Sequence, residues 1–321
     1  MRKDSLIFSL FILGISNLLT AQTSSPDTVL VGAYISSLYD FDIANNSIKA
    51  DIHLWCLYDN ESYDFENELE CLYCNEFNLT GTSVEDLNER KWFYTKATIE
   101  SRQKYSTSNF PFDTQKIVFG FESSEYEIDD YVFQTDLAGS NLDSIVLNQF
   151  DEWTVEKVEY ISSKTTYDTS FGDTESSLTT VPKFEIIISI KRLNSWLILF
   201  KLITGIIVAF LISSCVFWIK PINTDPRFGL CVGGLFAAIG NKYIVESIIT
   251  TTNKLTLLDY LHNITFIIIF LIIITSVLSL YIYEKGDEKS IKISKSIDTA
   301  SFFIFTFAYL LSFSYLINYY I

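Results

Sequence analysis

Residues 225–249 read DPRFGLCVGGLFAAIGNKYIVESII, a stretch long enough to cross a bilayer, since about 20 helical residues span the hydrocarbon core. It is unusual for a membrane span because it holds four glycines, an asparagine, a lysine and a glutamate. When residues are placed about 100° apart around a helix, the small and polar ones gather on one stripe. The stripe consists of Asp225, Gly229, Gly233, Phe236, Gly240, Tyr243 and Ser247. A membrane helix with such a stripe either packs closely against another helix or faces water.

The chain has 321 residues, 49% of them hydrophobic, which leaves room for two domains. Its first 21 residues combine a basic start, a short apolar run and a small-residue cleavage site ending at Ala21. This pattern predicts a secretory signal peptide over 1–21. A retained membrane anchor is the alternative, but the apolar run is short for a span and no stop-transfer charges follow it.

Charge divides the chain into two parts. Residues 22–190 hold 31 Asp and Glu against 10 Lys and Arg, whereas residues 191–321 hold 7 against 11. We therefore expect an acidic exported domain over 22–192 and a membrane domain over 193–321. An acidic surface argues against nucleic acid as a partner and tends to concentrate cations, although solubility alone explains it equally well.

Three of the five cysteines, Cys56, Cys71 and Cys74, fall in the exported part, where a disulfide can form. An extended strand holds Cys71 and Cys74 about 10 Å apart, so pairing these two needs a turn between them. The pairing among the three stays open. Cys215 and Cys231 lie in apolar stretches and are expected to be buried thiols. With only two histidines in the chain, no metal site is expected.

Apolar residues between 29 and 190 alternate with a period of two, which is typical of β-strands. Residues 48–56 and 184–190 show the alternation most clearly, and Asn45-Asn46 supplies a tight turn before the first of them. Further strands are expected over 29–38, 92–99, 116–121, 131–134 and 153–161. Many short alternating strands predict an all-β, immunoglobulin-like sandwich.

Four apolar stretches in the second half predict an all-α, four-helix transmembrane domain. The expected spans are at about 197–219, 226–249, 261–283 and 300–321. With a cleaved signal peptide, the sandwich and the C-terminus lie outside. The loop before the fourth span then lies inside, in agreement with the positive-inside rule. This loop carries Lys285, Lys289, Lys292 and Lys295.

A short motif makes the architecture more specific. Residues 110–115 read FPFDTQ and resemble the FPFDxQ signature of the pentameric ligand-gated ion channels, the Cys-loop receptor family. In animal members two cysteines flank this signature. Gln103 and Ile117 stand at the equivalent positions, as in the bacterial branch that lacks the disulfide. DEWTV at 151–155 is similar to the family's EWxL strand, and PRFGL at 226–230 resembles the start of its pore helix.

The resemblance covers roughly residues 28–321 in order and topology. It implies a homopentamer in the lipid bilayer of a bacterial inner membrane, with the sandwich and C-terminus in the periplasm. It also implies a central pore lined by the second span, inorganic cations as permeant ions and an unidentified small-molecule agonist. The family's tryptophan–proline–aspartate segment is missing, and residues 71–79 occupy roughly its place, so the ligand is the least transferable part.

If five second helices surround a pore, the stripe lines it. Asp225 then forms a ring of five carboxylates at the cytoplasmic mouth that favours cations. Asp225 followed by Pro226 is also a favourable helix start, and both roles can hold. Phe236 is expected to form a hydrophobic constriction, and Tyr243 and Ile244 a second one nearer the outer mouth.

The glycines of the stripe leave the interpretation open. Gly229, Gly233 and Gly240 would leave bare backbone in a lumen, but they are also typical of close helix packing, in which case no pore exists. Arg227 points away from the stripe, yet its sequence context is closer to that of anion-passing members. We expect a ligand-gated, cation-selective channel, and the alternative is a non-conducting pentameric receptor. An enzyme finds little support because no catalytic constellation is evident.

By resemblance, gating is coupled where the sandwich meets the outer ends of the helices, around residues 250–259. The residues expected at this junction are Asn45, Asn46, Phe112, Asp113, Arg192, Thr252 and Leu255. Asp113 and Arg192 are expected to form a partly desolvated pair, in which charge interactions count for more. The alternative is that Arg192 merely marks the membrane interface.

A retained ligand site would lie between neighbouring sandwiches under the hairpin tip at 165–180. Tyr126, Tyr167 and Phe171 are the aromatic candidates, because aromatic faces bind ammonium groups. The chain has 19 Tyr and 26 Phe, so such coincidences arise easily. Protons or divalent cations are alternative stimuli for a domain this acidic.

Overall fold

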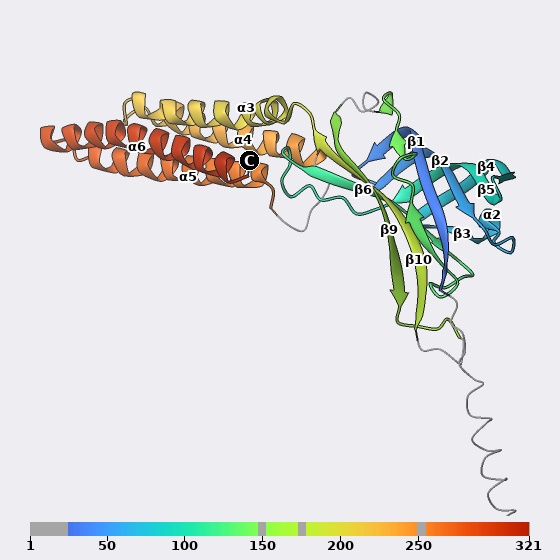
Figure 1. Cartoon of the computed structure of the whole chain (residues 1–321). Helices are drawn as coiled ribbons and strands as arrows, with labels where there is room; N and C mark the ends of the chain where they lie inside the picture. Colours follow the sequence, from blue (N-terminus) through green and yellow to red (C-terminus); the bar gives the residue numbers. More distant parts are fainter. Residues whose placement is uncertain (1–24, 147–151, 173–177, 249–254, 321) are drawn as a thin grey trace, which may run out of the picture.

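The computed structural model describes residues 25–146, 152–172, 178–248 and 255–320, and the predicted signal peptide at 1–21 lies outside them. Figure 1 shows a domain of strands joined at one end to a bundle of long helices. The strands are β1 (Asp27–Asp42), β2 (Ser47–Tyr58), β3 (Leu69–Leu72), β4 (Cys74–Leu87), β5 (Arg90–Arg102), β6 (Thr114–Ser123), β7 (Tyr131–Thr135), β8 (Asn141–Leu142), β9 (Trp153–Tyr167) and β10 (Thr179–Arg192).

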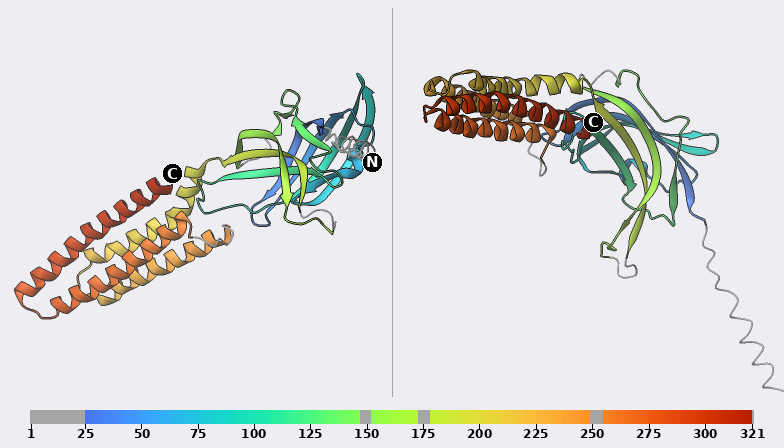
Figure 2. Two further views of the ribbon diagram at one scale, coloured as in Figure 1. Left: turned by 60° about the horizontal axis from the view of Figure 1, so that its bottom comes forward. Right: turned by 90° about the vertical axis from the view of Figure 1, so that its left-hand side faces the viewer.

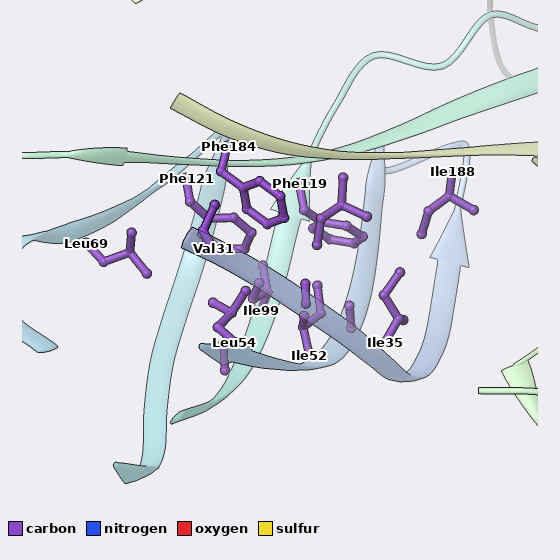
Figure 3. Packing of buried hydrophobic residues seen from close by; sticks show 14 of the residues in the cluster. Val31, Ile35, Ile52, Leu54, Leu69, Ile99, Phe119, Phe121, Phe184 and Ile188 are labelled. Carbon is purple, nitrogen blue, oxygen red and sulfur yellow. The ribbon is translucent and has the colours of Figure 1, made fainter. Parts of the chain in front are cut away.

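The strands form two sheets that enclose a hydrophobic core. One sheet has the order β4-β5-β2-β1-β7, with β8 also paired to β1, and the other has the order β3-β6-β10-β9. β1 pairs in parallel with β7 and β8, and its pairing with β2 is antiparallel. In Figure 3, Ile52 and Leu54 of the first sheet lie opposite Phe119 and Phe184 of the second. The predicted sandwich of two sheets is confirmed.

The alternating pattern is what places this core. Every second residue of β2 is buried, so Ile48 and Ile52 point into the core while Lys49 points outward. The expected strand runs are confirmed and extend a few residues further at their ends. β4 was not predicted, because this edge strand has no buried residue and therefore shows no apolar alternation.

Two turns follow from the sequence. Asn46 has a φ of 57°, in the left-handed region that Asn tolerates, and it closes the predicted turn between β1 and β2. A disulfide joins Cys71 to Cys74, whose Cα atoms are 5.7 Å apart. Tyr73 between them has a φ of 60° and supplies the turn that this pairing needs. Cys56 is a free, buried thiol.

Four helical segments are long and apolar enough to cross a membrane, which indicates a membrane-embedded protein. They are α3 (Ser195–Ser214) continued by the 3₁₀ turn η2 (Cys215–Trp218), α4 (Thr224–Ile248), α5 (Leu257–Tyr283) and α6 (Glu288–Tyr320). A further helical turn, α2 (Phe65–Glu68), belongs to the sandwich. Figures 1 and 2 show the four long helices side by side at one end of the sandwich.

Two expectations about the helices are wrong. α6 begins at Glu288 and not near residue 300, because Asp287 accepts hydrogen bonds from the Ser290 backbone N–H at 2.9 Å and hydroxyl at 2.8 Å, and so caps the helix. The lysines of 289–295 therefore lie on α6 and not in a loop. Cys215 is exposed, since Val216 and Phe217 are the residues that η2 buries, whereas Cys231 is buried as expected.

Small residues and short polar contacts hold the bundle together. A methyl group added to Gly234 of α4 would collide with Ser213 of α3, so these two helices touch through backbone. Between α5 and α6, the hydroxyls of Thr265 and Tyr309 lie 3.1 Å apart. The bundle therefore buries one side of α4 against α3 and α5.

Candidate functional site

The predicted stripe of α4 faces away from the other helices of the chain. Its seven residues and Ile244 are all exposed, with Phe236 at 69% and Tyr243 at 70%. A Cβ atom added at Gly229, Gly233 or Gly240 would meet no described atom within 4 Å. These glycines therefore make no close helix contact within the described chain, and the close packing falls instead to Gly234.

The exposed stripe of α4 differs in chemistry from the exposed faces of the other helices. The outward side chains there are mainly large and apolar, as on a surface that meets lipid tails: Leu211, Ile267, Phe270, Ile274, Phe303, Ile304, Phe307 and Leu310. The stripe carries only one large apolar side chain, Phe236, together with a carboxylate, three glycines, a tyrosine and a serine. Such a surface is a poor match to hydrocarbon, because a carboxylate is costly there and the glycines offer little apolar area to lipid tails.

The opposite side of α4 is fixed by a buried ion pair. Arg227, 1% exposed, donates from Nη2 to Oδ1 of Asp298 on α6 over 2.8 Å. The predicted direction of Arg227, away from the stripe, is thus confirmed. Its Nε and Nη1 have no hydrogen-bond partner among the described residues. The sequence did not indicate Asp298 as the partner, since α6 was expected to begin after it.

The FPFDTQ loop connects the sandwich to the helices. Phe110 belongs to the buried cluster of the bundle, and Phe112 packs against that cluster. The Phe112 ring meets Trp196 of α3 edge-on, with centroids 5.2 Å apart. An aromatic loop of the sandwich thus packs against the helix bundle beside the start of α3.

Asp113 and Arg192 form the pair that the sequence predicts. Arg192 Nε donates to Oδ1 of Asp113 over 2.8 Å, and Nη2 to Oδ2 over 3.3 Å. The two side chains are 7% and 2% exposed, so the pair is buried rather than partly desolvated. Arg192 also donates to Glu152 over 3.3 Å, and its guanidinium lies 4.2 Å from the centroid of the Trp153 ring. These contacts fix the end of β10 beside the start of α3.

A cavity of about 700 Å³ lies at the same junction. The β1–β2 turn lines it through Asp42 and Ala44, and the ends of α3 and α4 nearest the sandwich line it through Ile198 and Ile248. Asp42 accepts hydrogen bonds from the backbone N–H of Asn45 over 3.0 Å and from its side-chain amide over 2.7 Å, and these two contacts hold the pKa of Asp42 below its ordinary value. The turn therefore lies near the end of the candidate pore helix. Of the remaining expected junction residues, Leu255 is exposed, and Thr252 lies outside the described residues.

The structure divides the three ligand candidates into two groups. Tyr167 and Phe171 pair edge-on at the tip of the β9–β10 hairpin, with centroids 5.4 Å apart. Tyr126 packs elsewhere, against two tyrosines of the sandwich core. Its ring centroid lies 5.0 Å from that of Tyr63 and 6.0 Å from that of Tyr131. Part of the hairpin tip, 173–177, lies outside the described residues.

Each aromatic group has a buried carboxylate that the sequence did not indicate. Tyr167 donates its hydroxyl to Glu122, and burial together with this contact raises the pKa of Tyr167 to about 12. Glu68 lies near Tyr126, and burial raises the pKa of its carboxyl. In both glutamates Oε2 has no hydrogen-bond partner among the described residues. Glu68 and Glu122 follow no alternation that marks a core position, so only the fold reveals them.

No family model matches the chain, and no curated protein matches it. The sandwich followed by four membrane-capable helices is compatible with the architecture of pentameric channels.

Proposed function

We propose that this protein is a homopentameric, ligand-gated ion channel whose pore is lined by the exposed stripe of α4. The observation that carries the proposal is the chemistry of that stripe. Asp225, three glycines, Tyr243 and Ser247 are exposed on a helix whose other side is buried in the bundle, and they suit water better than lipid. Five copies around an axis would place this stripe toward a shared lumen.

Selectivity and gating follow from two positions. Five copies of Asp225 form a ring of carboxylates at one mouth, and such rings favour cations. Arg227 does not oppose this preference, because it is buried behind the stripe and neutralised by Asp298. Phe236 is the large apolar side chain in the middle of the stripe, and a ring of five closes the pore by dewetting.

The proposed stimulus acts on the sandwich. A cationic ligand, such as an ammonium compound, suits the Tyr167 and Phe171 rings beside the buried Glu122. Movement of the sandwich then reaches α3 and α4 through Phe112, Trp196 and the Arg192–Asp113 pair. Protons and divalent cations remain candidate stimuli, since the domain is acidic throughout.

Purified protein reconstituted in liposomes tests the proposal. Ion flux is recorded under a salt gradient after a step to acidic pH, addition of calcium or addition of a primary alkylamine. The expected result is a cation-selective current whose reversal potential moves toward zero in Asp225→Ala. Glu284→Gln is the matched control, because this exposed carboxylate lies at the same end of the bundle but outside α4. An unchanged reversal potential in Asp225→Ala rules out the carboxylate ring as the filter.

The alternative function is a non-conducting pentameric receptor of the same build. The observation that favours it is the bare backbone at Gly229, Gly233 and Gly240, which also suits close packing between copies. An intact pentamer without flux under any of these stimuli supports the receptor. A leak through Phe236→Ala supports the channel, because removing the apolar constriction opens a pore that already exists.

A further inference from the structure

A second cavity lies at the end of the bundle away from the sandwich. It has a volume of about 540 Å³ and lies among η2, the end of α5 and the first turns of α6. Its lining includes Trp218, Lys220, Tyr283, Lys295 and Asp298. The proposed channel function makes no use of it.

Two unpaired lysines give this cavity a positive charge. Neither Lys220 nor Lys295 lies within ion-pair distance of a described carboxylate. Asp298 also lines the cavity, but its carboxylate is held by Arg227 over 2.8 Å. The neighbouring Lys292 differs, because Glu288 lies 2.7 Å from its ammonium group. The cavity therefore holds two positive charges that the chain leaves unbalanced.

The remaining lining of the cavity suits a lipid at the membrane surface. Trp218 is 78% exposed and Tyr283 is half-buried, and aromatic residues of this kind concentrate at the headgroup level of a bilayer. Phe302, on α6, lies edge-on to Trp218 with centroids 5.6 Å apart and continues the apolar surface toward the membrane interior. A ligand in this position meets positive charge at one end and hydrocarbon-like surface at the other.

We propose that this cavity binds the phosphate of an anionic phospholipid from the leaflet on the side away from the sandwich. Lys220 and Lys295 bind the phosphate, and the acyl chains lie along Trp218 and Phe302. Because Asp298 forms both a wall of the cavity and the partner of Arg227, the lipid contacts the residue that ties α6 to α4. The proposal rests on membrane embedding alone, so its test does not depend on conduction.

Fluorescence quenching by brominated lipids tests the proposal on the full chain. The protein is reconstituted in phosphatidylcholine bilayers that contain either brominated phosphatidylglycerol or brominated phosphatidylcholine. The Trp218 signal is isolated as the difference between wild type and Trp218→Phe. We expect brominated phosphatidylglycerol to quench it at lower mole fraction, with a preference of about fivefold for each lysine.

Substitutions of matched lysines then locate the site. Lys220→Gln with Lys295→Gln is expected to abolish the preference, and each single substitution is expected to lower it about fivefold. Lys285→Gln with Lys292→Gln removes the same charge from the same end of the bundle outside the cavity, and is expected to preserve it. Equal quenching by the two lipids in wild type would overturn the proposal. So would a preference that survives loss of Lys220 and Lys295, or one that excess inorganic phosphate abolishes, since a soluble anion would then be the ligand.

Discussion

The two ends of the helix bundle each bury an arginine–aspartate pair, and the two pairs differ in how completely they are satisfied. At the sandwich end, Arg192 donates to both carboxylate oxygens of Asp113 and also to Glu152. At the far end, Arg227 donates to Asp298 through one nitrogen, and its other two have no partner among the described residues. The same two residue types are thus used in a complete and in an incomplete network.

The difference matters because burial of an ion pair is costly. Removing charges from water costs several kcal/mol per ion, and attraction compensates only when further hydrogen bonds satisfy the remaining groups. The Arg192 pair meets this condition, and aromatic rings of Phe110 and Trp153 lie against its guanidinium. The Arg227 pair does not. We therefore expect the first pair to stabilise the fold and the second mainly to fix the position of α4 against α6.

The largest expected effect follows from breaking the complete pair. Arg192→Ala leaves Asp113 buried without its cation, and we expect the free energy of unfolding to fall by about 3–5 kcal/mol. Thermal or denaturant unfolding of the detergent-solubilised protein measures this. Lys191→Ala is the matched control. Lys191 is the neighbour of Arg192 in the sequence, and its side chain forms only an exposed ion pair with Glu156 at 3.8 Å. Its expected cost is below about 1 kcal/mol. Equal effects of the two substitutions would contradict the importance assigned to the buried pair.

Replacing whole pairs by apolar residues separates the two networks more sharply. Arg227→Met alone should cost about 3 kcal/mol, since it leaves the buried carboxylate of Asp298 without its cation. Arg227→Met with Asp298→Leu should return stability to within about 1 kcal/mol of wild type, because the incomplete network loses few hydrogen bonds.

The corresponding double substitution at the sandwich end should not recover. In Arg192→Met with Asp113→Leu, the Gln115 side chain loses the carboxylate to which it donates over 2.8 Å, and we expect a residual cost of about 2 kcal/mol. Unfolding measurements on the four variants form two double-mutant cycles. Full recovery at both ends, or at neither, would show that the count of partners does not distinguish the pairs.

The sequence predicts the complete pair and misses the incomplete one for a physical reason. Asp113 lies in the FPFDTQ motif and Arg192 directly precedes the first span, so both are marked by local context. Asp298 could be recognised only by knowing where α6 begins. That start depends on a single capping side chain, Asp287. Helix starts are set by such local contacts, whereas long apolar runs are set by composition and are easier to predict.

The same distinction holds within the sandwich. The period of two places Ile48, Ile52 and their neighbours in the core, because a strand buried on one face must alternate. An edge strand such as β4 is not buried and carries no such pattern. Glu68 and Glu122 are buried by loops and strands distant in sequence, so neither residue has a signal of its own. The aromatic candidates could be proposed from the sequence, but their division into two groups could not.

A smaller test asks whether the number of hydrogen-bond partners also determines how a single carboxylate in the sandwich contributes to stability. Asp42 accepts from the backbone and side chain of Asn45, which lowers its pKa from the ordinary 3.8. Glu68 is buried with one oxygen unpartnered, which raises its pKa from the ordinary 4.5. The two carboxyls should therefore contribute to the pH dependence of stability with opposite signs.

The stabilising contribution of Asp42 is present above pH 3.8 and is lost as the pH falls through its lower pKa in the folded protein. The stabilising contribution of Glu68 is present below pH 4.5 and is lost as the pH rises through its higher pKa in the folded protein. Relative to wild type, Asp42→Asn should destabilise more at neutral pH than at pH 3, and Glu68→Gln more at pH 3 than at neutral pH. Unfolding curves of both variants at the two pH values measure this. If both variants changed the pH dependence of stability in the same direction, the number of hydrogen-bond partners would not explain the contributions of these isolated carboxylates, whatever it explains for the arginine pairs at the ends of the bundle.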